Sequence, residues 1–160
     1  MAITQRITPF LWFDTQAEDA ANFYCSVFKN SKVGQVVRYG DVGPGPKGQA
    51  MIVTFNLDGL NFTALNGGPR FKFDEAISFV VNCESQEEID HYWKALTADG
   101  GQEVQCGWVK DKFGLSWQVV PTIIGELMSD KDPQKSSRVM QAILQMKKLD
   151  IQTMKDAYEG

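Results

Sequence analysis

The chain has 160 residues, 43% of them hydrophobic, which is enough to bury a core without disulfides or a structural metal. Its net charge of −4, with no run of Lys or Arg, argues against nucleic acids and acidic membranes as partners, because both are negatively charged. Three widely spaced cysteines (Cys25, Cys83 and Cys106) predict neither a disulfide framework nor a zinc site, and no apolar run suits a signal core or a membrane span, so we expect a reduced, cytoplasmic protein.

The first part of the chain predicts one strand, one helix and then three strands. Thr15 and Glu18 have the spacing of a capping box, and an apolar stripe at helical period follows them. Asp58-Gly59 is a two-residue hairpin turn, and the Gly/Pro stretch 41–48 is a loop. The strands are expected at residues 3–13, 32–39, 49–57 and 60–65.

The same order of elements recurs further along the chain. A strand is expected at 76–83, and the Ser85/Glu88 pair is a second capping box before a helix. Adding 69 to Phe23-Tyr24 and Val27 leads to Tyr92-Trp93 and Leu96 on this second helix. Two modules, about 3–66 and 76–121, therefore indicate a duplication, and the second is short enough to have lost or shortened a strand.

The stretch 102–121 predicts a hairpin with strands at 104–109 and 115–120, joined by the turn Lys110-Asp-Lys-Phe-Gly114. Alternation puts Ser116, Gln118 and Val120 on one face of its last strand. A Gln between apolar neighbours must be hydrogen-bonded if it is buried. We therefore expect Gln118 to face a polar cavity or a ligand.

Residues 122–160 predict a helical extension to a domain that spans 1–121. A short helix is expected near 122–128, a second begins at Asp132-Pro133, and a third follows the cap Asp150. Their apolar residues recur every three or four positions. Such stripes must be covered by the same chain or by a partner chain.

Several blocks resemble the PhnB-like branch of the vicinal oxygen chelate (glyoxalase/bleomycin-resistance) superfamily, a branch often labelled 3-demethylubiquinone-9 3-methyltransferase. The blocks are Pro-Phe-Leu-Trp-Phe-Asp at 9–14, Ala-Ala-Asn-Phe-Tyr at 20–24, Leu-Asn-Gly-Gly-Pro at 65–69, Cys-Gly-Trp through Val-Val-Pro at 106–121, and Arg-Val-Met-Gln-Ala at 138–142. The resemblance implies an α+β fold in which two βαβββ-type modules form a curved sheet cup with helices outside. It also implies a homodimer.

Metal-dependent members of that superfamily carry His in the first strand of a module and Glu in the last strand. The resemblance puts Ser78 at a His position and Gln118 at the Glu position, with Thr8 and Thr63 as their counterparts in the first module. Hydroxyls and an amide do not make a tight site for a divalent cation. The only histidine, His91, is expected on a solvated helix face, so we predict no metal and no cofactor.

The predicted ligand site is the hollow of the cup, lined by apolar rings and a few polar anchors. Its lining residues would be Trp12, Thr63, Ser78, Trp108 and Gln118, with Phe71 and Phe73 in a loop as a lid. No catalytic residue is assigned. Cys106 has Lys110 as a cationic neighbour but no nearby His, so it is predicted to be structural.

Three functions remain open for such a hollow. The first is a metal-independent small-molecule enzyme or binding protein, and the second is a dimeric sequestering protein of the bleomycin-resistance type. The third is the methyltransferase of the label, although residues 13–18 lack the glycine-rich turn usual for S-adenosylmethionine. An enzyme should place a polar group of shifted ionisation in the cup, whereas a sequestering protein should not.

Overall fold

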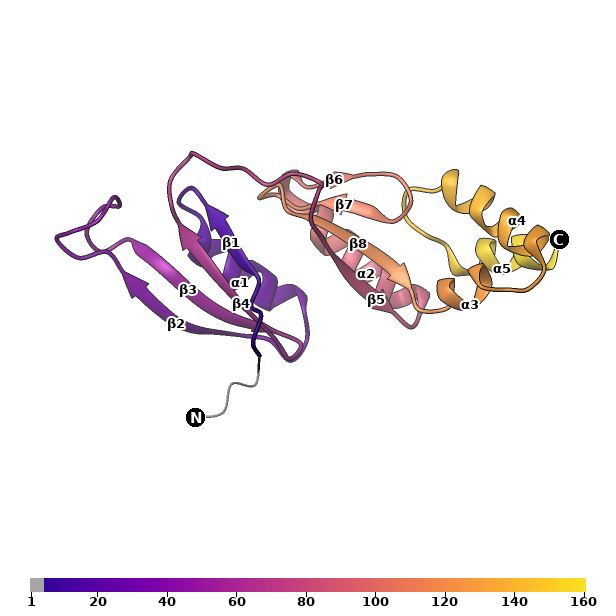
Figure 1. Ribbon diagram of the computed structural model, residues 1–160, viewed down its shortest axis with the longest axis horizontal. Helices are drawn as coiled ribbons and strands as arrows, with labels where there is room; N and C mark the ends of the chain where they lie inside the picture. Colours follow the sequence, from indigo (N-terminus) through magenta and orange to yellow (C-terminus); the bar gives the residue numbers. More distant parts are fainter. Residues whose placement is uncertain (1–4) are drawn as a thin grey trace. The chain divides into compact units, whose positions relative to one another are not determined.

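The computed structural model describes residues 5–160 and consists of two compact units that divide between Phe73 and Asp74 (Figure 1). The first unit contains β1 (Phe10–Phe13), α1 (Ala17–Val27), β2 (Lys32–Arg38), β3 (Ala50–Leu57) and β4 (Leu60–Asn66). The second contains β5 (Ser78–Cys83), α2 (Gln86–Thr97), the 3-10 turn η1 (Ala98–Gly100), β6 (Gln102–Glu103), β7 (Trp108–Lys110) and β8 (Ser116–Pro121). It ends with α3 (Ile124–Met128), α4 (Pro133–Leu144) and α5 (Ile151–Glu159).

Both units have the same sheet topology. The strand orders are β1-β4-β3-β2 and β5-β8-β7-β6, with a parallel first pair and antiparallel neighbours after it. A matching backbone bond closes each parallel pair, from Gly67 N to Phe13 O at 2.9 Å and from Thr122 N to Cys83 O at 2.9 Å. The predicted α+β fold of two modules is confirmed, and β8 lies inside its sheet as expected.

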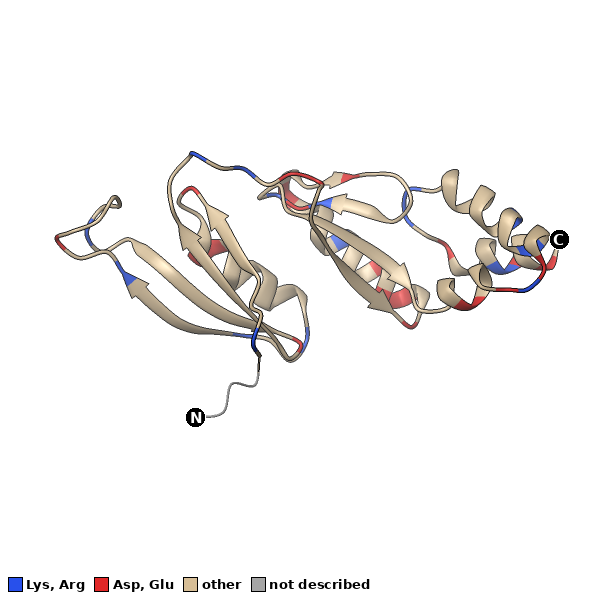
Figure 2. Cartoon of the chain, in the orientation of Figure 1, with Lys and Arg blue, Asp and Glu red and all other residues tan. Residues whose placement is uncertain are grey.

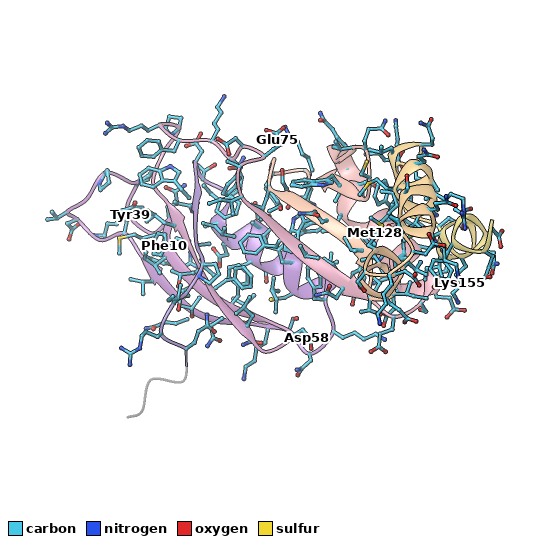
Figure 3. The ribbon with its side chains drawn as sticks, turned by 45° about the vertical axis from the view of Figure 1, so that its right-hand side comes forward. Phe10, Tyr39, Asp58, Glu75, Met128 and Lys155 are labelled. Carbon is cyan, nitrogen blue, oxygen red and sulfur yellow. The ribbon has the colours of Figure 1, made fainter. Side chains whose placement is uncertain are left out.

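Each sheet has one face against its helix and one open face. Residues on the helix side are buried, among them Leu11, Phe13, Val53, Phe55, Phe62 and Ala64 in the first unit and Val81, Val109, Trp117 and Val119 in the second. The alternate residues of the same strands point to the open face, and most of them are half-buried or exposed, although Ser116 is buried. Phe10, labelled in Figure 3, is 56% exposed on this face. The open faces are therefore where a ligand has access.

The two helices begin differently, and one predicted cap is wrong. Ser85 Oγ accepts from Glu88 N at 3.2 Å, so the capping box of α2 is confirmed. In α1 the N-cap residue is Gln16, whose side chain makes no capping bond. Ala17 N instead donates to Oδ1 of the buried Asn66 at 2.8 Å, because the end of β4 lies beside the start of this helix.

Two predicted strands are shorter than expected. The first was expected at 3–13 but begins at Phe10; residues 5–9 are irregular, and positions 3 and 4 lie outside the described residues. The strand expected at 104–109 is broken because Cys106 and Gly107 have positive φ values of 59° and 84°. β6 has 2 residues and β7 has 3, so the second module has shortened these strands without losing either.

The C-terminal helices bury part of their apolar stripes within the second unit, whereas Met140 and Leu144 on α4 stay 42% and 56% exposed. Asp132 and Asp150 cap α4 and α5 as predicted, by accepting from Gln134 N and Thr153 N. One buried cluster joins the three helices: Leu127, Val139, Ile143, Leu149 and Met154. None of the helices in residues 5–160 is long and apolar enough to cross a membrane.

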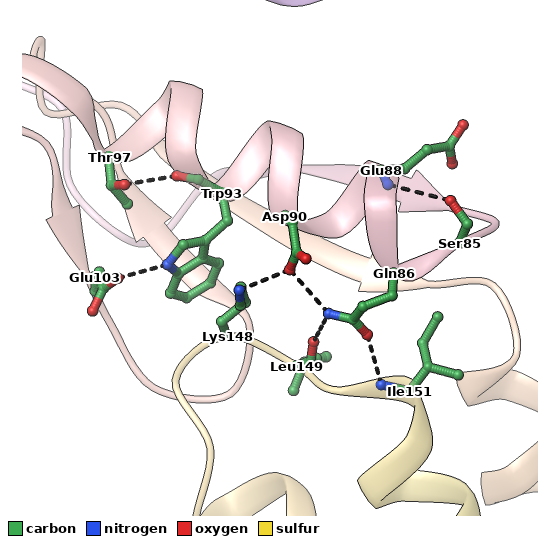
Figure 4. Close-up of polar contacts among 10 residues, drawn as sticks. All are labelled: Ser85, Gln86, Glu88, Asp90, Trp93, Thr97, Glu103, Lys148, Leu149 and Ile151. Carbon is green, nitrogen blue, oxygen red and sulfur yellow. Dashed lines mark hydrogen bonds and ion pairs between the residues drawn. The ribbon is translucent and has the colours of Figure 1, made fainter.

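The segment before α5 is tied to α2 and to the broken strand. Gln86 donates through Nε2 to Leu149 O at 3.1 Å and accepts through Oε1 from Ile151 N at 2.8 Å (Figure 4). Lys148 forms an ion pair with Asp90 at 2.7 Å. Backbone N–H groups of residues 106 and 107 donate to the carbonyls of 146 and 147, both at 2.8 Å. The helical extension is thus part of the second unit.

Candidate ligand-binding site

Gln118 and Ser78 form the polar centre of the open face in the second unit. Gln118 lies on β8 and donates through Nε2 to Ser78 Oγ on β5 at 2.9 Å, although the two residues are 40 positions apart. Both are half-buried. Trp108 on β7 is the register partner of Gln118 on its other side. The amide therefore has a hydrogen-bond partner and keeps its carbonyl oxygen for a ligand.

The turn before β8 is held by one buried carboxylate. Asp111 is 3% exposed and accepts from Phe113 N at 2.9 Å, Leu115 N at 3.1 Å and Trp117 Nε1 at 2.9 Å. An Asp that bonds its own following backbone stabilises a turn and fixes where the next strand begins. The predicted turn at 110–114 is present, and its contact with Trp117 sets which residues of β8 face the helix.

Two further polar groups lie on this open face and were not predicted to be site residues. Ser116 is 1% exposed, and within residues 5–160 its hydroxyl has no hydrogen-bond partner. Lys110 forms an ion pair with Glu75, and its hydrogen bond lowers the pKa of that carboxyl. Ser116 could have been found from its place two residues before Gln118, since both share a face.

In the first unit, Trp12 lies on the open face under the loop after β4. Its indole Nε1 donates to Gly68 O at 2.9 Å, and the ring of Phe71 meets it edge-on at 5.0 Å. A side chain at Gly67 would collide with Trp12, because a Cβ there would lie 2.3 Å from Cζ2. Phe71 is 54% exposed beside Trp12, as a lid residue would be.

Phe73 lies in a different environment from Phe71. Its ring contacts Phe13 edge-on at 5.1 Å, and Phe13 points to the helix side of the sheet. Phe73 is half-buried there. The structure therefore places Phe71 with the open face and Phe73 with the core, so the two rings do not form one lid.

A hollow of about 380 Å³ lies on the open face of the first unit. We call it the Lys32 hollow; its lining consists of Thr8, Lys32, Gly34, Thr54, Phe55, Asn56, Asn61, Phe62 and Thr63. Of the predicted site residues it includes Thr63 but not Trp12. Sequence reasoning missed Lys32 and the two asparagines, because strand register alone brings them beside Thr63.

A second hollow of about 220 Å³ lies in the same unit, between the segment after β1, the loop after β2 and the end of β4 with the loop that follows it. Tyr39 lines it and donates its hydroxyl to Asn66 O at 2.7 Å; Figure 3 labels this residue. Gly45 must remain without a side chain, since a Cβ there would lie 2.2 Å from the Tyr39 ring. This packing explains how the Gly/Pro loop is held.

The polar residues singled out in the two modules hold equivalent positions. Counting back along the strands from the matching bonds that close each parallel pair, Thr63 corresponds to Gln118 and Thr8 corresponds to Ser78. Ser78 and Gln118 are joined directly, whereas Thr8 and Thr63 share the Lys32 hollow. The structure thus brings each pair together within its own unit.

These residues do not fit a divalent metal ion. Within either unit, over the described residues, no three His, Cys, Asp or Glu side chains come close enough to hold one. Neutral hydroxyls and an amide attract a hard cation far less than carboxylates do. His91 is exposed on α2, with its ring against Tyr92. We therefore derive no step through a metal.

The cysteines are not set up as nucleophiles. Burial raises the pKa of the Cys25 thiol, and burial followed by the nearby Glu88 charge raises that of Cys83 to about 11. Cys106 is half-buried against the C-terminal cluster. A thiol that packs this way acts as a small apolar side chain.

Comparison with known proteins gives a consistent picture. The model of the family described as 3-demethylubiquinone-9 3-methyltransferase matches residues 5–120. A PhnB protein from Bacillus cereus is 37% identical, has a TM-score of 0.68, and the alignment covers 74% of this chain and 100% of that one. A protein of Pseudomonas aeruginosa is 20% identical with a TM-score of 0.61, covering 74% and 98%.

The fosfomycin resistance protein FosX from Listeria monocytogenes, solved with Mn(II) and sulfate, is 14% identical with a TM-score of 0.50, covering 75% and 91%. The search of the curated proteins finds no match. The family model spans most of the chain, and the Bacillus cereus protein is covered in full. The chain therefore belongs to the family described as 3-demethylubiquinone-9 3-methyltransferase.

Proposed function

We propose that the protein binds small organic molecules at the open face of each sheet, and that it does so without a metal ion. The observation that carries this proposal is the 2.9 Å hydrogen bond from Gln118 to Ser78. By the resemblance, Gln118 and Ser78 stand where metal-dependent members of the superfamily carry Glu and His. An amide and a hydroxyl there can orient a carbonyl or hydroxyl group of a ligand by hydrogen bonds.

The site chemistry favours binding over acid–base catalysis. None of the predicted site residues is titratable: they are Trp12, Thr63, Phe71, Phe73, Ser78, Trp108 and Gln118. Lys110 on the same face is paired with Glu75 and lowers the pKa of that carboxyl, which keeps it in the charged form. General acid–base catalysis needs a group whose pKa lies near the working pH. A sequestering protein of the bleomycin-resistance type has no such requirement.

The experiment compares wild type with Gln118→Leu, using Nile red as a neutral apolar probe of the open face. We expect the variant to change the fluorescence titration while its unfolding free energy stays within about 1 kcal/mol of wild type, the usual worth of one hydrogen bond. Gln105→Leu, at an exposed position in the same unit, is the control. An unchanged titration, or a loss of several kcal/mol, would make Gln118 a structural residue instead.

Metal content is checked separately on the purified protein. Elemental analysis should find no stoichiometric zinc, nickel, manganese or iron after brief dialysis, because the donor set is neutral. One tightly held equivalent per chain would contradict the proposal. The double variant Ser78→His/Gln118→Glu should bind Ni(II) more tightly than wild type. It places an imidazole and a carboxylate at two positions whose side chains are in hydrogen-bond contact, at 2.9 Å, in wild type.

The family description itself favours a second candidate, a methyltransferase that uses S-adenosylmethionine. The residues present do not fit that cofactor. The junction of β1 and α1 contains no glycine, the first turn of α1 carries Glu18 and Asp19, and the N–H of Ala17 is already bonded to Asn66. Calorimetric titration of the protein with S-adenosylmethionine tests this candidate. Binding heat that saturates at one equivalent per chain would support it.

A homodimer remains a prediction of the resemblance. The C-terminal helices bury part of their apolar stripes within the second unit, but Met140 and Leu144 stay exposed and leave apolar surface for a partner chain. Deleting residues 133–160 tests the two roles. If the helices cover only their own unit, the truncated chain should aggregate through the exposed remainder of the cluster. Soluble monomers from a dimeric wild type, measured by light scattering, would instead assign the helices to a dimer interface.

A further inference from the structure

We propose that the Lys32 hollow binds an oxyanion group, such as a carboxylate, phosphate or sulfate, of a small molecule at the open face of the first sheet. This inference rests on the proposed function and adds the charge of the ligand to it. The Lys32 hollow lies wholly within the first unit, so its geometry is complete in that unit.

Strand register explains why the hollow exists. Lys32, Asn56 and Asn61 form one row across β2, β3 and β4 on the open face. Thr54 and Thr63 form the next row. β2 supplies no side chain to this second row, because Gly34 lies over Thr54: a Cβ on Gly34 would come within 2.6 Å of Thr54 Oγ1. The missing side chain leaves space above the threonines, with the ammonium group at its edge.

The hollow presents hydrogen-bond donors and no carboxylate. Asn56 Nδ2 donates to Asn61 Oδ1 at 2.8 Å, which fixes the Asn61 amide and leaves its own Nδ2 for a ligand. In the described part of the chain, neither the hydroxyls of Thr8 and Thr63 nor the Lys32 ammonium has a hydrogen-bond partner. Hydrogen bonds from such groups to an anion are stronger than those between neutral groups.

Lys32 also differs from every other charged residue in the strands. The strands contain four charged residues, and Figure 2 shows them at strand ends. Arg38 and Lys110 are paired with carboxylates, and Glu103 accepts from an indole N–H. Among residues 5–160 no carboxylate pairs with Lys32. The Lys32 ammonium is therefore available to an external anion, and the hollow beside it has room for one.

The test uses inorganic phosphate and ¹⁵N-labelled full-length protein, with ionic strength held constant by sodium chloride. Amide shifts should concentrate on β2 and on residues 54–63, and Lys32→Met should weaken phosphate binding about tenfold, as expected for one charge-assisted hydrogen bond. Lys47→Met is the matched control, since it removes the same charge from the same unit but lies outside the hollow. Equal affinity of wild type and Lys32→Met would overturn the inference, and so would equal losses in both variants.

A second variant guards against a purely electrostatic effect. Thr63→Val keeps the shape of the side chain and the net charge, and it should weaken phosphate binding several-fold because one donor is lost. Unchanged binding in Thr63→Val would mean that phosphate does not enter the hollow, which also overturns the inference.

The outcome separates this inference from the proposed function. Nile red carries no charge, so its dependence on Gln118→Leu reports the proposed function without involving Lys32. If Gln118→Leu changes Nile red binding but Lys32→Met leaves the affinity for phosphate unchanged, only the oxyanion inference fails. If Lys32→Met weakens phosphate binding but Gln118→Leu leaves Nile red binding unchanged, the hollow is an anion site and the proposed function fails.

Discussion

The first module and the second share one strand order but are held together by different means. In the first, the long strands β2 and β3 (7 and 8 residues) build the sheet, and the buried Asn66 starts the helix from the neighbouring strand. In the second, β6 and β7 are short, and the helix starts with its own Ser85. The three C-terminal helices then pack on this shortened hairpin through one apolar cluster that includes Cys106. In the second module, the C-terminal helices thus supply buried apolar contacts where the strands β6 and β7 are short.

The variant Asn66→Ala tests most directly whether the two helices are capped by different means. It removes the acceptor of Ala17 N and the donor to Ala50 O (2.9 Å) from a buried position. We expect a loss of about 2–4 kcal/mol, since two buried groups are left without partners. Urea unfolding measures it. Ser85→Ala is the matched cap variant in the second module and should lose only about 1 kcal/mol. Equal losses would show that the two helices are not capped differently.

A smaller effect is expected where the extension meets α2. Gln86→Ala removes the amide bonds to Leu149 O and to Ile151 N at the start of α5, together with the bond to Asp90, at an expected loss of about 1–2 kcal/mol. Hydrogen exchange should accelerate in α4 and α5 and stay unchanged in the first unit, which has no such extension. Glu87→Ala, exposed on the same helix, is the control. Faster exchange in both units would mean that the extension is not a local addition.

The smallest effect concerns acid. Hydrogen bonds from Lys148 and Gln86 lower the pKa of Asp90, and bonds from Thr153 lower that of Asp150. A carboxyl whose pKa is lower in the folded state than its ordinary value, near 4, stabilises the folded form at pH values above that ordinary value. This contribution is lost as the pH falls through the lowered pKa of the folded state. Below about pH 4 the segment around α5 should loosen first, as seen in amide spectra. Asp90 is exposed and Asp150 is only half-buried, so the effect is modest. Loosening of the first unit before α5 would contradict this assignment.

Local patterns in the sequence determined much of the fold. Period-two alternation set the faces of β8, the Asp-x-x-Gly spacing set the turn around Asp111, and cap residues located α2, α4 and α5. The repeat at 69 residues revealed the duplication. Each of these signals depends on neighbours in the chain, so one sequence suffices to find it. The polar character of Gln118 and its neighbours was predictable in the same way.

Only the tertiary structure decided which distant residues meet. Asn66 reaches the start of α1 across 49 positions, and Gln118 reaches Ser78 across 40. The gap at Gly34, which opens the Lys32 hollow, exists because register sets it over Thr54. Register depends on how whole strands pack, and a shift of one residue would turn every one of these side chains to the other face. The sequence therefore determined the modules and their polar residues, while strand pairing decided the sites those residues form.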